Sequence, residues 1–423
     1  MPRRAALLAG LAAGLVAGSA GASPAASSDI FARYAAGVVK VEILESGSAS
    51  KRSIGSGFAV VPEGSFVTNY HVVAASLHDP DRYQVKIRTQ DGAEHDATLV
   101  AFDVVQDLAL LRSRDARGRP FELHDGGALR KGERLFSLGN PLDLGMSVVE
   151  GTYNGLLEHS RYARIHFSGS LNPGMSGGPA LLANGEVAGV NVATAGEQIS
   201  FLVPVRAVTT LLARARQAGF EPPADLHAEL RDQLLRQQEA YLAEILAQPF
   251  GEVRMGPYSA PTGLAPFFNC WGDAPVDEKA FFQQRAHACF TEDRVFVSDE
   301  QSFAIVELHH RQVESSQLSG RRFYSLYSWL FEQDFSKRWG REQDVTAFRC
   351  HTGFVENATL TFKATFCARE FRRLPGLYDV VFKAAALGQR SQGFETALLL
   401  SGVALEPARE LAQRVLESIR WAE

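Results

Sequence analysis

The sequence predicts a multi-domain protein in which an all-β domain is followed by a helical linker and an α+β domain. The chain has 423 residues, enough for two or three domains. From about residue 30 to 205 it reads as short strands separated by Gly, Pro and Asp. From residue 206 the apolar residues recur with a helical period, and after residue 251 short β-like runs return.

The composition excludes several classes of protein. With 46% hydrophobic and 22% charged residues, the chain is neither a disordered protein nor a collagen-like or coiled-coil rod. The net charge of −5 offers no basic surface for nucleic acid or an anionic membrane. We therefore expect no nucleic-acid partner, and no motif suggests a cofactor.

The first 22 residues have the pattern of a signal peptide. Arg3 and Arg4 precede an apolar stretch over 5–17, which is too short to span a bilayer. The small residues Ala20-Gly21-Ala22 then offer a cleavage site. We expect an exported bacterial protein, periplasmic or secreted, without stable membrane insertion after cleavage. An uncleaved N-terminal anchor is the alternative.

The all-β domain is expected over residues 30–205. Its apolar runs are short and regularly spaced, which is typical of a β-sandwich or a β-barrel. The runs cover residues 38–44, 55–61, 83–89, 133–139, 180–184 and 199–205.

The linker is expected over residues 206–250 and contains two helical stretches. The first covers 206–217, and Pro222-Pro223 separates it from a longer one over 225–248. The longer stretch places apolar residues on roughly one face, namely Leu226, Leu230, Leu234, Tyr241 and Ile245. This face either packs on the protein's own domains or joins two copies in a homo-oligomer.

The C-terminal domain, residues 251–423, has an α+β pattern. Four β-like runs cover 294–298, 303–309, 358–366 and 378–385. A helix is expected to start at Pro407, with Leu411, Val415 and Ile419 on one face. Aromatic residues form either part of the core or a binding face: Phe281, Phe282, Tyr324, Tyr327 and Trp329.

All four cysteines lie in this C-terminal domain. Disulfides are the default in an exported protein, and the sequence-local pairs Cys270–Cys289 and Cys350–Cys367 are favoured among three pairings. A zinc site supported by His287 and His351 is the alternative. The sequence has neither C-x-x-C nor H-x-x-x-H, so we expect no metal.

Three short motifs carry candidate chemistry. The stretch Asn172–Pro179 (NPGMSGGP) places Ser176 between glycines on a tight turn, where the backbone N–H groups of Gly174 and Ser176 can form an oxyanion hole. His71, in TNYHVV, follows an apolar strand and can act as a general base. Asp107, in QDLALL, leads an apolar run and can orient a histidine. Each motif alone also fits a turn or a structural residue.

Taken together, the motifs resemble those of a known family. The order His71, Asp107, Ser176 fits the chymotrypsin-like double β-barrel, and residues 30–215 resemble the protease domain of the HtrA/Deg branch of trypsin-like serine peptidases. The resemblance implies His71 as base, Asp107 as its orienting residue, Ser176 as nucleophile and protein or peptide substrates. Met175 departs from the family, in which Asn often precedes the serine. No PDZ pattern follows residue 250, and the C-terminal domain is not recognised.

The resemblance also locates a substrate pocket. The residue six before the nucleophile is the uncharged Ser170, so selection of Lys or Arg at P1 is not expected. With Leu171, Val190, Val192 and Thr194 as walls, we expect small to medium apolar P1 residues. The leading hypothesis is therefore an exported serine endopeptidase. Two alternatives are a catalytically silent binding or scaffold protein, and a ligand- or envelope-binding C-terminal domain regulated by the protease.

Overall fold

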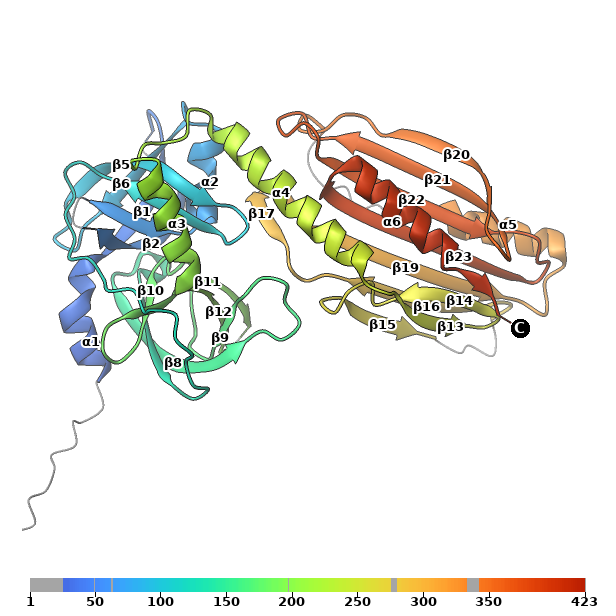
Figure 1. Cartoon of the computed structure of the whole chain (residues 1–423), viewed down its shortest axis with the longest axis horizontal. Coiled ribbons are helices and arrows are strands. Elements are labelled where there is room, and N and C mark those ends of the chain that lie inside the picture. The colour runs from blue at the N-terminus through green and yellow to red at the C-terminus, as the bar shows by residue number, and fades with distance from the viewer. Residues whose placement is uncertain are drawn as a thin grey trace, which may run out of the picture.

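The computed structural model describes residues 26–48, 50–61, 64–196, 198–274, 280–332 and 342–422. The expected signal peptide, residues 1–22, lies outside the described residues. Two β-barrels form one half of the molecule and a large sheet forms the other, with a long helix running between them (Figure 1). No helix in the described ranges is long and apolar enough to cross a bilayer.

The first barrel is closed and antiparallel, with strand order β1-β2-β3-β6-β5-β4. Alternation along β1 turns Val39, Val41 and Ile43 into the core, as the period of two in the sequence requires. A short helix, α2, crosses between β3 and β4 and carries the HVV part of the second motif. The elements are β1 (Val38–Glu45), β2 (Lys51–Val61), β3 (Ser65–Thr68), α2 (Tyr70–His78), β4 (Tyr83–Arg88), β5 (Glu94–Asp103) and β6 (Leu108–Arg112).

The second barrel is also closed, with strand order β10-β11-β12-β9-β8-β7. Phe136 and Leu138 from this barrel share a core with Phe58 and Leu110 from the first, so the barrels pack directly on each other. The double β-barrel predicted from the sequence is therefore confirmed. The elements are β7 (Arg134–Gly139), η2 (Pro141–Asp143), β8 (Ser147–Leu156), β9 (Ile165–Phe167), β10 (Pro179–Leu181), β11 (Val187–Gly196) and β12 (Ile199–Pro204).

Helices at both ends of this region cover the inter-barrel core. The N-terminal α1 (Ser27–Tyr34) and η1 (Ala35–Gly37) lead into β1. Helix α3 (Val205–Gln217) buries Val208, Leu211 and Leu212 in the core shared by the barrels. The first part of the expected linker therefore belongs structurally to the barrels.

Helix α4 (Leu226–Ala247) connects the two halves (Figure 1). The Asp225 carboxylate caps it by accepting hydrogen bonds from the N–H groups of the second and third helical residues, at 2.9 and 3.0 Å. Leu230 and Leu234 are buried in a core with the first barrel, while Tyr241 and Ile245 are buried in the core of the C-terminal domain. The apolar face is covered by the chain itself, so self-association through the 225–248 helix is not supported.

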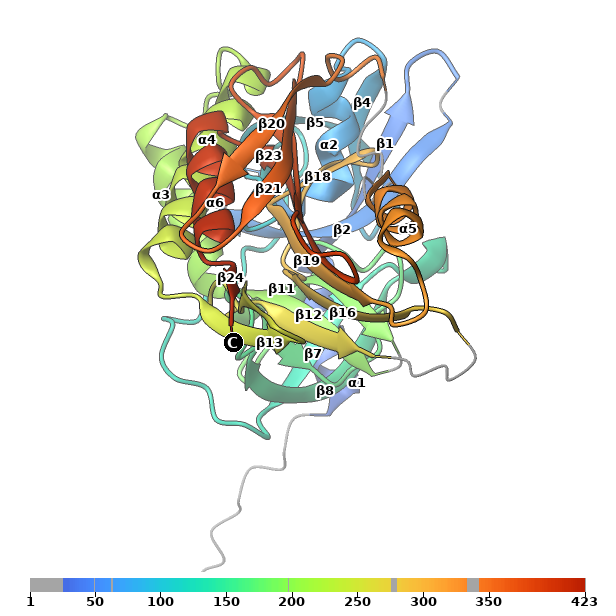
Figure 2. The ribbon, with the colours of Figure 1, turned by 90° about the vertical axis from the view of Figure 1, so that its right-hand side faces the viewer.

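The C-terminal half is built on a seven-stranded antiparallel sheet with order β15-β16-β19-β23-β22-β21-β20. Figure 2 shows α5 (Gly320–Glu332) and α6 (Leu405–Glu417) on opposite faces of this sheet. The alternation of β19 agrees, because Val306 and Leu308 pack with α6 while Val313 packs with α5. The strands are β15 (Asn269–Asp273), β16 (Gln283–Phe290), β19 (Ile305–Glu314), β20 (Arg349–Glu356), β21 (Thr361–Glu370), β22 (Tyr378–Ala386) and β23 (Gln392–Val403).

Two details of this half differ from the sequence-based expectations. Helix α6 begins at Leu405, so Pro407 is its third residue and still lies in the first turn, where no intrahelical donor is needed. The five aromatic residues divide: Tyr327 is buried, Phe282 and Tyr324 pack partly buried beside it, and Phe281 and Trp329 are exposed. A small sheet closes one end, formed by β13 (Gly251–Met255), β14 (Tyr258–Thr262) and β24 (Arg420–Trp421).

One hairpin of the C-terminal half packs against the first barrel. It consists of β17 (Val295–Ser298) and β18 (Gln301–Phe303). Val295, Val297 and Phe303 are fully or almost fully buried in the same core as Tyr70 and Leu77 of α2. The two halves therefore share a hydrophobic core.

Candidate active site

His71 is the second residue of α2. Strand β3 ends at Thr68, and Asn69 occupies the N-cap position with extended backbone angles, so His71 follows an apolar strand, as expected, but already lies in the first turn of a helix. The Asn69 side chain donates a 2.7 Å hydrogen bond to the Asp107 carbonyl. The strand-to-helix turn is thereby tied to the loop that carries Asp107.

Asp107 holds the histidine through both carboxylate oxygens. Oδ2 lies 2.6 Å from His71 Nδ1, and Oδ1 accepts the His71 backbone N–H at 2.8 Å. Asp107 has φ of 59°, a left-handed conformation that Asp tolerates better than most residues. Because a carboxylate only accepts, the proton of a neutral imidazole lies on Nδ1 and the Nε2 lone pair is left for a substrate or a nucleophile.

The electrostatic environment favours the protonated histidine. Burial lowers the pKa of His71, but the charge of Asp107 and its hydrogen bond raise it by more, so this pKa lies above its ordinary value of 6.5. The carboxylate of Asp299, in the hairpin of the C-terminal half, raises it further. An imidazolium formed during a reaction is therefore stabilised here.

The loop that carries Ser176 lies against β2 and the start of α2. The Ser176 carbonyl accepts the Ser56 N–H at 2.7 Å. A Cβ on Gly55 would come within 3.1 Å of that carbonyl and 2.7 Å of both Val72 methyl groups, and Val72 follows His71 directly. Among the described residues, neither the Ser176 hydroxyl nor His71 Nε2 has a hydrogen-bond partner. Ser176 is thus brought beside the histidine segment without bonding to the ring.

Two backbone N–H groups of the serine loop, those of Gly174 and Ser176, are candidate donors for an oxyanion hole. The Pro173 carbonyl accepts from Leu142 N–H at 2.8 Å, and the Met175 carbonyl accepts from Gly178 N–H at 3.0 Å. In a trans peptide the N–H points opposite to the carbonyl, so the N–H groups of Gly174 and Ser176 turn away from those partners. No acceptor in the described part of the chain takes either N–H, as an oxyanion hole requires.

Glycine is required at position 174. Its φ is +96°, and a Cβ there would lie 2.3 Å from the Asn140 carbonyl oxygen. Met175, which replaces the Asn often found in the family, is fully buried in the core of the second barrel. The position before the serine therefore serves packing and carries no charge.

Two buried polar residues that the sequence analysis did not identify hold this loop. Ser56 Oγ donates to the Gly174 carbonyl at 2.7 Å and accepts the Asn140 N–H at 2.9 Å. Asn191 Nδ2 donates to the Met175 carbonyl at 3.1 Å. The only sequence signal was a small polar residue inside an apolar strand, in GSGF and in GVNV.

A cavity of about 750 Å³ opens beside the histidine. The first barrel contributes His71 and Asp107, the second contributes Val192 and Phe201, and the C-terminal half contributes the residues Asn269, Glu292, Asp293, Arg294, Phe296 and Asp299. The Phe296 ring meets the His71 ring at a centroid distance of 6.0 Å and an interplanar angle of 76°. Both halves of the molecule therefore line the cavity beside His71, whereas Ser176 and Gly174 are not among its lining residues.

The expected substrate-pocket residues divide between this cavity and the core. Val192 lines the cavity, whereas Ser170 and Thr194 are exposed outside it. Val190 and Leu171 are buried in hydrophobic cores and are not pocket walls. Val190 and Val192 pack in the same hydrophobic core, but Val190 is fully buried whereas Val192, next to the register shift between Asn191 and Ala193, is only partly buried and also lines the cavity.

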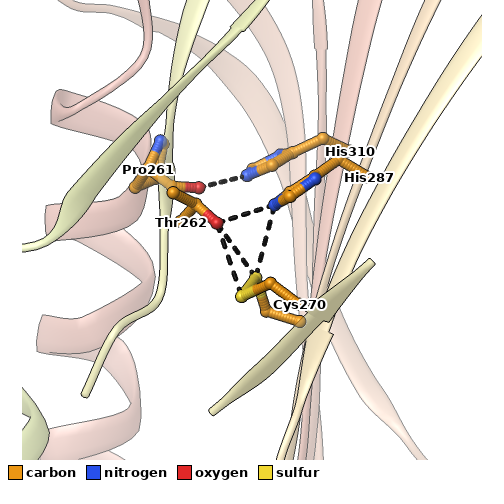
Figure 3. The surroundings of a disulfide bond; sticks show 6 residues. Pro261, Thr262, Cys270, His287 and His310 are labelled. Carbon is orange, nitrogen blue, oxygen red and sulfur yellow. Dashed lines mark hydrogen bonds between the residues drawn. A yellow bond between two sulfur atoms is a disulfide. The ribbon is translucent and has the colours of Figure 1, made fainter. Parts of the chain in front are cut away.

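The cysteines form two disulfides, which are the sequence-local pairs Cys270–Cys289 and Cys350–Cys367. Each bridges directly opposed residues of neighbouring strands. Figure 3 shows the first, with His287 Nε2 3.5 Å from Cys289 Sγ and 2.6 Å from Thr262 Oγ1. With both sulfurs bonded to each other, the Cys270, His287 and Cys289 group lacks the thiolates that the alternative zinc site would use.

Comparisons with known proteins agree with the geometry of the barrels. A family model described as trypsin-like peptidase domain matches residues 55–190. Serine protease HTRA2, mitochondrial, from Bos taurus is 32% identical over 190 residues, which are 42% of this chain and 40% of that protein. Serine protease HTRA3 from Homo sapiens is 30% identical over 198 residues, 44% of each.

A solved serine endoprotease from Yersinia pestis is 27% identical over 47% of this chain and 69% of that chain, with a TM-score of 0.41. The chain spans less than half the length of the two curated relatives.

Proposed function

We propose that this chain, whose barrels form an HtrA-type trypsin-like serine protease domain, is a serine endopeptidase that cleaves protein or peptide substrates through an acyl-enzyme. The observation that carries the proposal is the double contact of Asp107 with His71, at 2.6 and 2.8 Å, beside a serine loop with two unpartnered N–H groups. His71, Asp107 and Ser176 then have the roles of general base, orienting carboxylate and nucleophile.

The residues perform acyl transfer in two steps. Ser176 Oγ attacks the substrate carbonyl carbon while His71 Nε2 takes the hydroxyl proton, and the carbonyl oxygen becomes an anion held by the N–H groups of Gly174 and Ser176. The C–N bond then breaks as Nε2 returns that proton to the leaving amine. Water attacks the remaining ester in the same way, which releases the acid and restores the Ser176 hydroxyl.

In this structure the Ser176 hydroxyl does not hydrogen-bond to His71 Nε2. Such hydrogen bonds are often long in the absence of substrate and tighten in the Michaelis complex. The loop backbone that carries Ser176 is already held by hydrogen bonds from Ser56 and Asn191.

The finer parts of the proposal concern specificity and location. The apolar side chain of Val192 in the cavity beside His71 supports small to medium apolar P1 residues. The two disulfides and the N-terminal pattern of residues 1–22 support export to the periplasm or the medium. A P1 preference for Arg in a peptide panel would contradict the first of these expectations.

Fluorophosphonate labelling tests the proposed activity. The full mature chain should be labelled at Ser176 and should cleave an unstructured protein, and Ser176→Ala should lose both reactions. Ser418→Ala is a matched control at the residue that directly follows the C-terminal helix α6. Failure of the folded protein to label would favour the alternative of a catalytically silent binding or scaffold protein.

A further inference from the structure

The hairpin β17–β18 is fixed rigidly next to the catalytic histidine. Its Val297 carbonyl accepts hydrogen bonds from Tyr70 Oη at 3.0 Å and His78 Nε2 at 2.8 Å, two side chains of the helix that carries His71. At the hairpin tip, Asp299 forms an ion pair with Arg52 of the first barrel. The hairpin therefore keeps a fixed place relative to the histidine.

Strand alternation turns one side chain of this hairpin into the cavity. Val295 and Val297 are buried in the shared core, so Phe296 between them faces the other way, toward His71. The segment before β17 adds Glu292, Asp293 and Arg294 to the same wall. Val192 and Ala193 of β11 line the same cavity.

Strand β11 sets the direction in which a substrate would lie. The proposed P1 pocket is walled by this strand, so the part of the peptide on the acyl side of the cut continues along it. A peptide extended along Val192 and Ala193 would place its next residues, P2 and P3, in the cavity that these residues line together with Phe296. The C-terminal half would then contact the substrate directly.

Negatively charged side chains outnumber positively charged ones around the cavity. Five carboxylates line it, from Asp107, Glu158, Glu292, Asp293 and Asp299, against two guanidinium groups, from Arg164 and Arg294. Three of the carboxylates are engaged: Asp107 by His71, Asp299 by Arg52, and Asp293 by Ser160 Oγ at 2.7 Å. Glu158 and Glu292 are exposed and have no partner among the described residues.

We propose that the segment 292–299 of the C-terminal half completes the substrate cleft, and that Glu158 and Glu292 select a lysine or arginine side chain at P2 or P3. The aliphatic stem of such a side chain packs along Phe296 while its charged end reaches the two glutamates. This subsite rests on the proposed peptidase function. It adds a preference for a positively charged residue at P2 or P3 to the preference for an apolar residue at P1.

The test compares peptides that differ by one charge. Two fluorogenic series with an apolar P1 carry either lysine or norleucine at P2 or P3, so that the stem is kept and only the ammonium group is removed. An exposed ion pair changes a rate by roughly 1.4- to 5-fold. With two glutamates acting together we expect kcat/KM to favour lysine by about ten-fold at low salt.

Charge-neutral variants assign the preference to the two glutamates. Glu158→Gln and Glu292→Gln should each lower the lysine/norleucine ratio about three-fold, and the double variant should bring it near one. Glu356→Gln, at the far edge of the C-terminal sheet, should leave the ratio unchanged. A ratio near one in the unaltered protein, or a ratio indifferent to the double variant, overturns the proposal.

A binding measurement separates this subsite from the proposed activity. The Ser176→Ala protein should bind the lysine peptide more tightly than the norleucine peptide in fluorescence anisotropy, and the added Glu158→Gln and Glu292→Gln changes should remove the difference. Small-probe labelling of Ser176 in the unaltered protein reports on the peptidase alone. Labelling without charge-dependent binding refutes the subsite, whereas charge-dependent binding without labelling supports it and refutes the peptidase.

Discussion

Ser56 lies in the first barrel, and replacing it by alanine should disturb the serine loop of the second barrel, which carries the proposed oxyanion hole. The Ser56 hydroxyl is fully buried and connects three segments: its own strand β2, the Gly174 carbonyl at 2.7 Å and the Asn140 N–H at 2.9 Å. Alanine leaves that carbonyl and that N–H without partners. A buried unsatisfied group costs about 1–3 kcal/mol, so with two such groups the free energy of unfolding should fall by about 2–6 kcal/mol.

The loss of activity should exceed what this destabilisation explains. Ser56 fixes the peptide plane that follows Gly174, and the N–H of Gly174 is one of two donors of the proposed oxyanion hole. Loss of one such donor lowers kcat by about 10²- to 10³-fold in serine peptidases. We expect Ser56→Ala to lose about 10²-fold in kcat for a peptide substrate, measured at a temperature where the protein is still folded.

Ser401→Ala is the matched control for Ser56→Ala. Ser401 is equally buried and donates a 2.7 Å hydrogen bond to Asp379, but it lies on β23 in the C-terminal sheet. Urea unfolding should show a loss of stability in both variants, while only Ser56→Ala should lose turnover. If Ser56→Ala is destabilised as expected but turns over at the unaltered rate, then the loop does not depend on this hydroxyl.

Three further predictions concern the histidine and the disulfides. Asp107→Asn should lower kcat by about 10⁴-fold because the imidazole loses its orienting carboxylate, and residual activity above a tenth would contradict this role. The Asp299 carboxylate raises the pKa of His71, and the base must be neutral to act; Asp299→Asn should therefore move the acidic limb of the kcat/KM profile to lower pH, while Glu356→Gln should not. Replacing Cys270 and Cys289 by alanine opens a loop of 19 residues and should lower the free energy of unfolding by about 3 kcal/mol in urea, with Ser176 labelling retained.

The sequence was sufficient for features set by local pattern. Alternation in VVKVEIL and a helical period after residue 206 predicted β1 and α3 to within a residue or two of their bounds. The glycines around Ser176 predicted a tight turn, and Gly174 does adopt a positive φ that other residues rarely adopt. These features depend on the residues themselves and their near neighbours.

Features set by contacts between distant segments were missed. The period of β17 shows that one face is buried, but nothing in it says that the partner is α2, more than 200 residues earlier. The register shift in β11 is equally invisible, because it arises from the pairing of β11 with β12. Ser56 looks like an ordinary strand residue until the second barrel places Gly174 and Asn140 on either side of it.

Helix α2 connects the candidate active site to the C-terminal half of the molecule. Its first turn presents His71 to Asp107, while Tyr70 and His78 bind the Val297 carbonyl and Leu77 packs in the core shared with the hairpin. Burial lowers the pKa of His78, which favours the neutral form of that side chain. The orientation of His71 and the position of the hairpin β17–β18 thus both depend on helix α2. A change in the C-terminal half that shifts the hairpin must act on the histidine through this helix, whichever substrate occupies the cleft.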